Sequence, residues 1–318
     1  MESPGARERR RARPSRSHRP LLCTVLAVVA VAGATAGGTV YVRAGAHPGT
    51  AAVASPATSA SREGVEPVVE SATDYDAVLA AALGSVAVPD GAKVSVAVRD
   101  VGSAAGAVYG DAAFDTASIV KVDILAALLL RAQDAGRRLT AQEKTYATAM
   151  IEHSDNASAS ALWDAIGRAE GLDAANARFG LTATSGGEGA LWGLTQTTAA
   201  DQLTLLRQVF GDSGDEGCAL SATSRAYLRQ LMERIAVGQR WGISAAADGS
   251  AWALKNGWLP RSTTGRWDVN SIGRITAGGR TFLVAVLSNG AATQEDGIAL
   301  VEAAARAAVT ALAGAAGG

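Results

Sequence analysis

The chain has 318 residues, of which 48% are hydrophobic and 19% are charged, proportions that suit one sizeable globular domain with accessory segments. Its formal net charge is -1, but residues 1–20 carry seven arginines against two glutamates, or +5, which leaves -6 for the rest. A mildly acidic body argues against a nucleic-acid partner. The body also has one cysteine, Cys218, and one histidine, His153, so we expect no internal disulfide, zinc site or other cofactor site.

The N-terminal part has the pattern of a membrane-targeting segment. Residues 21–42 contain no charged side chain, and as a helix they would span roughly 30 Å, enough to cross a bilayer core. The basic segment 1–20 before them would stay in the cytoplasm by the positive-inside rule. We therefore predict a single-pass transmembrane signal anchor at the cell membrane with the body extracytoplasmic. A signal peptide cleaved near residues 44–46, which would give a secreted protein, is the alternative.

Residues 43–72 are rich in Ala, Ser, Thr, Pro and Gly without periodicity, which predicts a flexible linker, and residues 73–318 form the predicted globular domain. Hydrophobic periodicity and capping residues give the elements of this domain. Helices are expected at 75–83, 118–135, 140–153, from 156 through 166, from 197 or 198 to 210, from 221 or 223 to 237, and 294–312. Strands are expected at 93–99, within 102–109, and at 251–256, 267–276 and 281–287.

This order of elements predicts an α/β (α+β) fold. Strands from both ends of the domain would form one antiparallel sheet flanked by terminal helices, with an all-helical lobe inserted between them. Residues 181–196 are glycine-rich and aperiodic, and we expect a loop there.

The predicted helix that starts at Ser118 carries a lysine where burial is expected. Residues 119–132 are apolar on almost every side, which is typical of a buried helix, and i, i+3 spacing places Ser118 and Lys121 on one face. An unpartnered buried ammonium costs several kcal/mol or has a lowered pKa. Lys121 therefore needs a structural partner or a chemical task, such as accepting the proton of Ser118. The alternative is that Ser118 only caps the helix.

Two further polar motifs follow in the chain. His153-Ser154-Asp155-Asn156 lies at a junction of two predicted helices, and Lys255-Asn256-Gly257-Trp258 ends a predicted strand. Taken alone, the first is a set of capping residues and the second a strand end. In this order after Ser-x-x-Lys, they resemble the signature of class A β-lactamases and penicillin-binding proteins over about residues 75–315.

The resemblance implies a two-lobed β-lactamase/transpeptidase-like fold and a role for each matching residue. Ser118 would be the acylated nucleophile, Lys121 would help to deprotonate it, and Ser154 would pass a proton to the leaving nitrogen.

The same resemblance assigns substrate binding to the other matching positions. Asn156 would bind the amide carbonyl of the substrate, and Lys255, in the Lys255-Asn256-Gly257 motif, would steer its carboxylate. The backbone N–H groups of Ser118 and Trp258 would form the oxyanion hole.

The sequence departs from the family pattern at three points. Asn256 replaces the usual hydroxyl residue but can still donate a hydrogen bond, so it would bind substrate together with Lys255, Gly257 and Trp258. The short gap between the first two motifs implies a trimmed helical lobe. The Glu-x-x-Leu-Asn loop, whose glutamate activates the deacylating water in class A enzymes, is missing. Glu188 is the only carboxylate residue between Asp173 and Asp201, so it is the candidate deacylation base, with a solvated loop residue as the alternative.

These observations predict an extracytoplasmic, monomeric serine hydrolase that acts through an acyl-enzyme. Its substrates would be β-lactams or related acyl-D-alanine-type amides, that is, small molecules or peptidoglycan peptides. One alternative is a D,D-peptidase or esterase without β-lactam turnover. Another is a non-hydrolytic binding or sensor module of the cell envelope.

Overall fold

The computed structural model describes residues 73–103, 105–211, 217–249 and 251–315. The basic segment, the transmembrane segment and the linker predicted within residues 1–72 lie outside this part of the chain.

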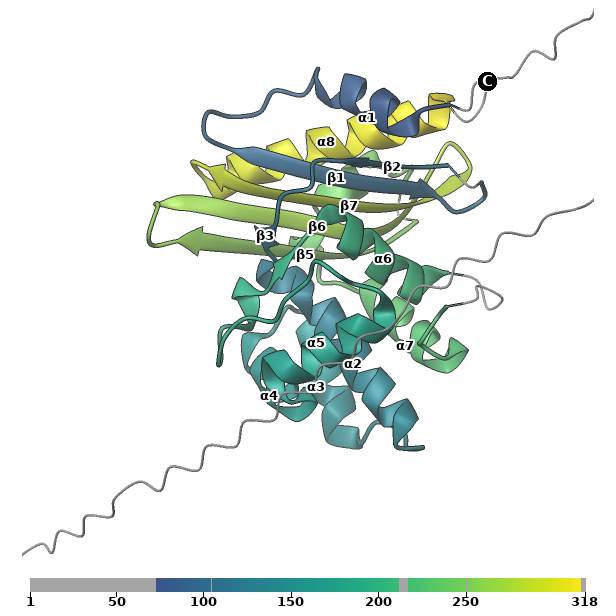
Figure 1. The fold of residues 1–318 in the computed structure, drawn as a ribbon, viewed down its shortest axis with the longest axis vertical. Helices are drawn as coiled ribbons and strands as arrows, with labels where there is room; N and C mark the ends of the chain where they lie inside the picture. The colour runs from purple at the N-terminus through teal and green to yellow at the C-terminus, as the bar shows by residue number, and fades with distance from the viewer. Residues whose placement is uncertain (1–72, 104, 212–216, 250, 316–318) are drawn as a thin grey trace, which may run out of the picture. The chain divides into compact units, whose positions relative to one another are not determined.

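The described residues form a five-stranded antiparallel sheet in the order β2-β1-β7-β6-β5, as expected for strands contributed by both ends of the domain (Figure 1). Its strands are β1 (Lys93–Asp100), β2 (Gly106–Tyr109), β5 (Trp252–Arg261), β6 (Arg266–Ala277) and β7 (Arg280–Ala291). The last three are longer than their hydrophobic patterns predict. Pro260 lies within β5 although proline has no backbone N–H to donate. The position is tolerated because β5 is an edge strand, so one side of its backbone pairs with no other strand.

Both faces of the sheet are buried, as the alternating side chains of its central strand β7 show. Phe282, Val284 and Val286 pack into one cluster, while Leu283 and Ala285 pack into the other. Helices α1 (Tyr75–Leu83) and α8 (Gln294–Ala315) cover the first face (Figure 1). This arrangement confirms the predicted fold class.

Within the described residues, only α8 is long and apolar enough to cross a membrane. Its residues Val301, Ala304 and Ala305 are fully buried in the cluster on the sheet. Packing against β6 and β7 therefore accounts for its apolar composition.

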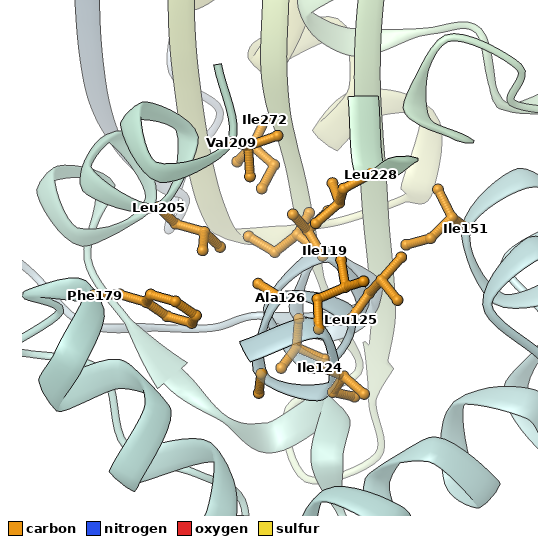
Figure 2. Close-up of a cluster of buried hydrophobic side chains, with 14 of the residues drawn as sticks. Ile119, Ile124, Leu125, Ala126, Ile151, Phe179, Leu205, Val209, Leu228 and Ile272 are labelled. Atoms are coloured by element: carbon orange, nitrogen blue, oxygen red, sulfur yellow. The ribbon is translucent and has the colours of Figure 1, made fainter. Parts of the chain in front are cut away.

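The second face of the sheet meets an inserted helical lobe built around α2 (Val120–Asp134). Figure 2 shows apolar side chains from the surrounding helices and from the sheet converging on this helix, among them Phe179, Leu205, Leu228 and Ile272. The surrounding helices are α3 (Ala141–Glu152), α4 (Asn156–Ile166), α5 (Arg168–Phe179), α6 (Ala199–Phe210) and α7 (Ala222–Met232). As predicted, α2 is buried on nearly all sides.

Helix α5 was not predicted from the sequence. Its buried side chains Leu172, Ala175 and Phe179 follow helical spacing, but Gly171 and several polar residues interrupt the pattern. Gly171 is required by close packing, because a Cβ there would lie 1.8 Å from the carbonyl oxygen of Ile166. A second difference is that α7 ends at Met232 rather than near residue 237.

Candidate active site

Ser118 lies in a single 3₁₀ turn, Ala117–Ile119, that leads into α2. The residue before it, Ala117, has φ 47°, a left-handed conformation that costs a residue with a Cβ about 1 kcal/mol or more. Ser118 itself is partly exposed and lines a cleft. The strained turn therefore presents the hydroxyl of Ser118 at the surface while α2 continues into the core.

Lys121 is fully buried one turn after Ser118 and has three hydrogen-bond acceptors. Its Nζ donates to the carbonyl oxygen of Ser154 at 2.7 Å, to Ser154 Oγ at 3.0 Å and to Asn156 Oδ1 at 2.8 Å. The ammonium form can donate three protons, and these three acceptors use all of them. The sequence motifs around Ser118 and Ser154 thus meet at this amine.

Ser154 is held in a tight turn between α3 and α4. Its φ is 58°, so it is a second strained non-glycine residue at the site. The next residue, Asp155, caps α4 by accepting a hydrogen bond from Ser158 N at 2.6 Å, which fixes the turn.

Lys255 on β5 approaches the same hydroxyl from the opposite lobe. Its Nζ donates to Ser154 Oγ at 3.1 Å, to the carbonyl oxygen of Asn256 at 2.8 Å and to Gln239 Oε1 at 3.4 Å. Ser154 Oγ therefore accepts from both lysines, which leaves its own proton free to be donated. The three groups form a chain, Lys121–Ser154–Lys255, through which a proton can pass.

Burial shifts the pKa values of both lysines downward. Desolvation lowers the pKa of Lys121 to about 7, and the negative charge of Asp155 opposes this shift. Desolvation also holds the pKa of Lys255 well below its ordinary value, and the nearby charge of Lys121 lowers it further. At neutral pH a substantial fraction of Lys121 is therefore an uncharged amine, the form that can accept a proton.

Gly257 brings β5 directly against the Ser118 turn. A Cβ at this position would lie 2.6 Å from Ser118 N and 2.8 Å from Thr116 O, so no other residue fits without a shift of the backbone. The next residue, Trp258, lines the cleft with Ser118. Strand β5 is an edge strand, so one side of its backbone is not used by the sheet and borders this site.

Asn256 is placed differently from the expectation that it would contact substrate in place of the usual hydroxyl. Its side chain is fully buried, and its Nδ2 donates to the carbonyl oxygens of Gln239 at 2.8 Å and Trp241 at 2.9 Å. The amide therefore joins β5 to the segment 239–241, and Asn256 does not line the cleft.

The cleft next to Ser118 has a volume of about 490 Å³. It is lined by Ala117, Ser118 and Asn156, by the loop segment 190–194, and by residues 258–263 of β5 and its turn. None of these lining residues carries a carboxylate. Glu188, the candidate deacylation base, is exposed and does not line the cleft.

Arg261 is the one charged residue that lines the cleft, and sequence reasoning did not single it out. It forms an ion pair with Asp115, and its Nε lies 3.8 Å from Asp268 Oδ2. Desolvation and then the charge of Asp115 raise the pKa of Asp268 to about 6, while Arg261 opposes the shift. No sequence signal links these residues, because Asp115 is distant from Arg261 in the chain and only tertiary packing brings it to the β5–β6 hairpin.

Trp192 is the second cleft residue that sequence reasoning missed. It belongs to a 3₁₀ turn, Trp192–Leu194, inside the predicted loop 181–196. Its ring centroid lies 4.9 Å from Lys121 Nζ. Within the described parts of the chain, no group of three or more His, Cys, Asp or Glu side chains is arranged to hold a metal.

Comparisons with known proteins identify the family of this chain. The family model described as "Beta-lactamase enzyme family" matches residues 130–312, more than half of the chain. The matched stretch includes the second and third motifs but begins after Ser118. A search of curated proteins finds no match.

Several solved structures share the fold at low sequence identity. The TLA-1 extended spectrum β-lactamase is 16% identical, with a TM-score of 0.63 over 75% of this chain and 98% of that chain. PBP-A is 20% identical, with a TM-score of 0.63 over 75% of this chain and 96% of its own. A β-lactamase from Xanthomonas campestris pv. campestris is 22% identical, with a TM-score of 0.57 over 73% and 95%.

The structural likeness to these proteins establishes the fold of the chain, and the match to the family model establishes its family. The chain belongs to the β-lactamase enzyme family and is a serine hydrolase of the β-lactamase type.

Proposed function

We propose that the protein forms an acyl-enzyme through Ser118 with β-lactams or related acyl-D-alanine-type amides. The observation that carries this proposal is the buried amine of Lys121, one turn after Ser118, with a pKa lowered to about 7 and a direct hydrogen bond to Ser154. A lysine of this kind can act as a general base at neutral pH.

Acylation would begin when uncharged Lys121 accepts the proton of Ser118 Oγ, and the oxygen attacks the substrate carbonyl. The N–H groups of Ser118 and Trp258 would stabilise the oxyanion, a contribution of about 3–4 kcal/mol for each such donor. The hydroxyl of Ser154 would then give its proton to the leaving nitrogen. It would regain a proton from Lys121, which donates to it at 3.0 Å.

Substrate binding would use the remaining polar groups at the site. Asn156 lines the cleft and would bind the amide carbonyl of the substrate, although in the free enzyme its Oδ1 accepts from Lys121. Lys255 is fully buried, so it would act on a substrate carboxylate through Ser154 Oγ, to which it donates at 3.1 Å, rather than by open contact.

The site has fewer candidate catalytic groups for deacylation than for acylation. The cleft lining has no carboxylate, and Glu188 is exposed away from it. We therefore propose that the acyl-enzyme is long-lived, which favours a penicillin-binding D,D-peptidase or esterase over an efficient β-lactamase. A mutant of the structural neighbour PBP-A is known as an acyl-enzyme complex with penicillin G, which supports a penicillin as the test ligand.

The place of action is also part of the proposal. The arginine-rich segment 1–20 and the uncharged segment 21–42 support a membrane-anchored enzyme with its catalytic domain outside the cytoplasm, or a secreted one if the segment is cleaved. Peptidoglycan peptides and β-lactam antibiotics would both be accessible there. We propose that it acts as a monomer.

Incubation of the purified protein with a fluorescent penicillin tests the proposal. We expect a covalent adduct, one per chain by intact mass, whose tryptic peptide carries the label on Ser118. Ser118→Ala, with an unchanged circular dichroism spectrum, should give none. If the parent protein forms no Ser118-dependent adduct with penicillins or with acyl-D-alanine thioesters, the proposed function is wrong.

A further inference from the structure

A tryptophan lies against the catalytic lysine on the loop side of the cleft. The Trp192 ring centroid is 4.9 Å from Lys121 Nζ, and the same residue lines the cleft beside Ser118. Lys121 is fully buried, so the indole covers its amine on this side. The nearest carboxylate residue of the loop, Glu188, is exposed instead.

The surrounding loop fixes the position of the ring. Trp192 Nε1 donates to Ser160 Oγ of α4 at 3.1 Å, and the carbonyl oxygen of Trp192 accepts from Thr195 N at 3.2 Å. Gly187 packs against the turn so closely that a Cβ there would lie 2.1 Å from the carbonyl oxygen of Leu191. Gly187 N also donates to Thr195 Oγ1 at 3.1 Å. The indole is therefore held from both its ring and its backbone.

This placement matters for the acyl-enzyme, because hydrolysis needs a water beside both the acyl carbonyl and a base. The amine of Lys121 is the base proposed for Ser118, and the indole lies against it on the loop side, in the space that a water would need. A ring also offers no hydrogen-bond acceptor in its plane to hold a water in line for attack.

We propose that Trp192 controls the lifetime of the acyl-enzyme by excluding water from Lys121. The inference rests on the proposed acylation of Ser118 and names the residue that limits the second half of that reaction. Trp192 is a positioning residue in this account, because it acts on water and on Lys121 rather than on the substrate.

A smaller side chain at position 192 would allow the following hydrolysis. A water entering beside Lys121 gives one proton to the uncharged amine, and its oxygen attacks the acyl carbon. The bond from that carbon to Ser118 Oγ then breaks, Ser118 Oγ regains the proton from Lys121, and the free acid leaves. No reactant other than water is required.

The experiment compares Trp192→Ala, Trp192→Phe and the parent after acylation with a fluorescent penicillin and removal of excess label. We expect Trp192→Ala to shorten the adduct half-life at least tenfold, since a positioned general base accelerates proton transfer by about 10²–10⁴-fold. Trp192→Phe keeps a ring against the amine and should stay within about threefold of the parent. The released product, identified by mass, should be the ring-opened hydrolysed acid.

The pH profile separates water activation from simple loosening of the fold. In Trp192→Ala the deacylation rate should rise with pH through the pKa of Lys121, which lies above the parent's value of about 7 because the admitted water reduces the desolvation of the amine. Trp252→Ala is the matched control, because Trp252 also lies under a cation, Arg240, at 5.5 Å but does not line the cleft. Its adduct should last as long as that of the parent.

The outcomes are distinct. A parent protein without an adduct overturns the proposed function itself. An adduct that forms in Trp192→Ala and lasts as long as in the parent overturns the role of Trp192. If Trp192→Ala does not fold, as judged by circular dichroism, Trp192→Leu replaces it, and the same unchanged half-life has the same meaning.

Discussion

Replacing Gly257 by alanine should abolish most of the acylation activity without unfolding the protein. The added Cβ would lie 2.6 Å from Ser118 N, 2.8 Å from Ile119 N and 2.8 Å from Thr116 O, all of them backbone atoms. An ordinary contact begins near 3.4 Å, so β5 and the Ser118 turn must separate by about 0.8 Å.

That separation falls between the two proposed oxyanion donors, the N–H groups of Ser118 and Trp258. A donor at about 2.9 Å from the oxyanion would move to about 3.7 Å, which is no longer a hydrogen bond. Losing one such donor lowers rates by about 10²–10³-fold, so we expect a loss of that size in the second-order acylation rate constant.

The assay is stopped-flow acylation by a fluorescent penicillin, with thermal melting of each variant measured in parallel. Gly314→Ala is the control, because a Cβ at Gly314 in α8 meets no heavy atom within 4 Å, and its acylation rate should equal that of the parent. If Gly257→Ala acylates within threefold of the parent while remaining folded, the oxyanion hole does not lie between these two segments.

Three other predictions concern ionisable side chains. The acylation rate should fall about tenfold for each pH unit below 7 and level off above it, because protonated Lys121 cannot accept the proton of Ser118; a flat profile from pH 5 to 8 would contradict this role. Asp123 is buried on α2, and desolvation raises the pKa of its carboxyl from 3.8 to about 8, so the folded state should lose stability as pH rises from about 4 to 8. Asp123→Asn removes this loss, which is on the order of 5 kcal/mol at most. In urea unfolding, the free energy of unfolding of the variant should therefore increase relative to that of the parent as pH rises. A difference between the two free energies that stays constant from pH 5 to 8 would disprove the burial argument. Glu188→Gln should leave the lifetime of the penicillin adduct unchanged, whereas a lifetime extended tenfold would restore Glu188 as the deacylation base.

The sequence was sufficient to predict the architecture because the main elements are set by local patterns. The all-round apolar composition of residues 119–132 predicted the buried helix α2, and capping residues predicted the start of α3 near residue 140. Their capping box is present, with Thr140 Oγ1 accepting from Glu143 N at 3.1 Å. Helix α5 was not predicted because Gly171, which close packing requires, interrupts its apolar spacing.

The arrangement of side chains in the cleft depends on contacts between distant segments and could not be predicted in this way. Nothing in a glycine-rich loop indicates that Trp192 reaches Lys121, since its position depends on Ser160 of α4. Asn256 was expected to face the substrate, but the carbonyl oxygens of the segment 239–241 draw its amide into the interior. These contacts join residues that only the packing of the two lobes brings together.

The two left-handed residues at the site, Ala117 and Ser154, set stability and activity against each other. Glycine at either position would relieve about 1 kcal/mol of backbone strain, yet it would also free the turns that orient Ser118 and the hydroxyl between the two lysines. Selection for heat resistance alone would therefore favour substitutions that loosen the catalytic geometry. An engineer seeking a more durable enzyme should leave these two turns untouched and stabilise α1 or α8 instead.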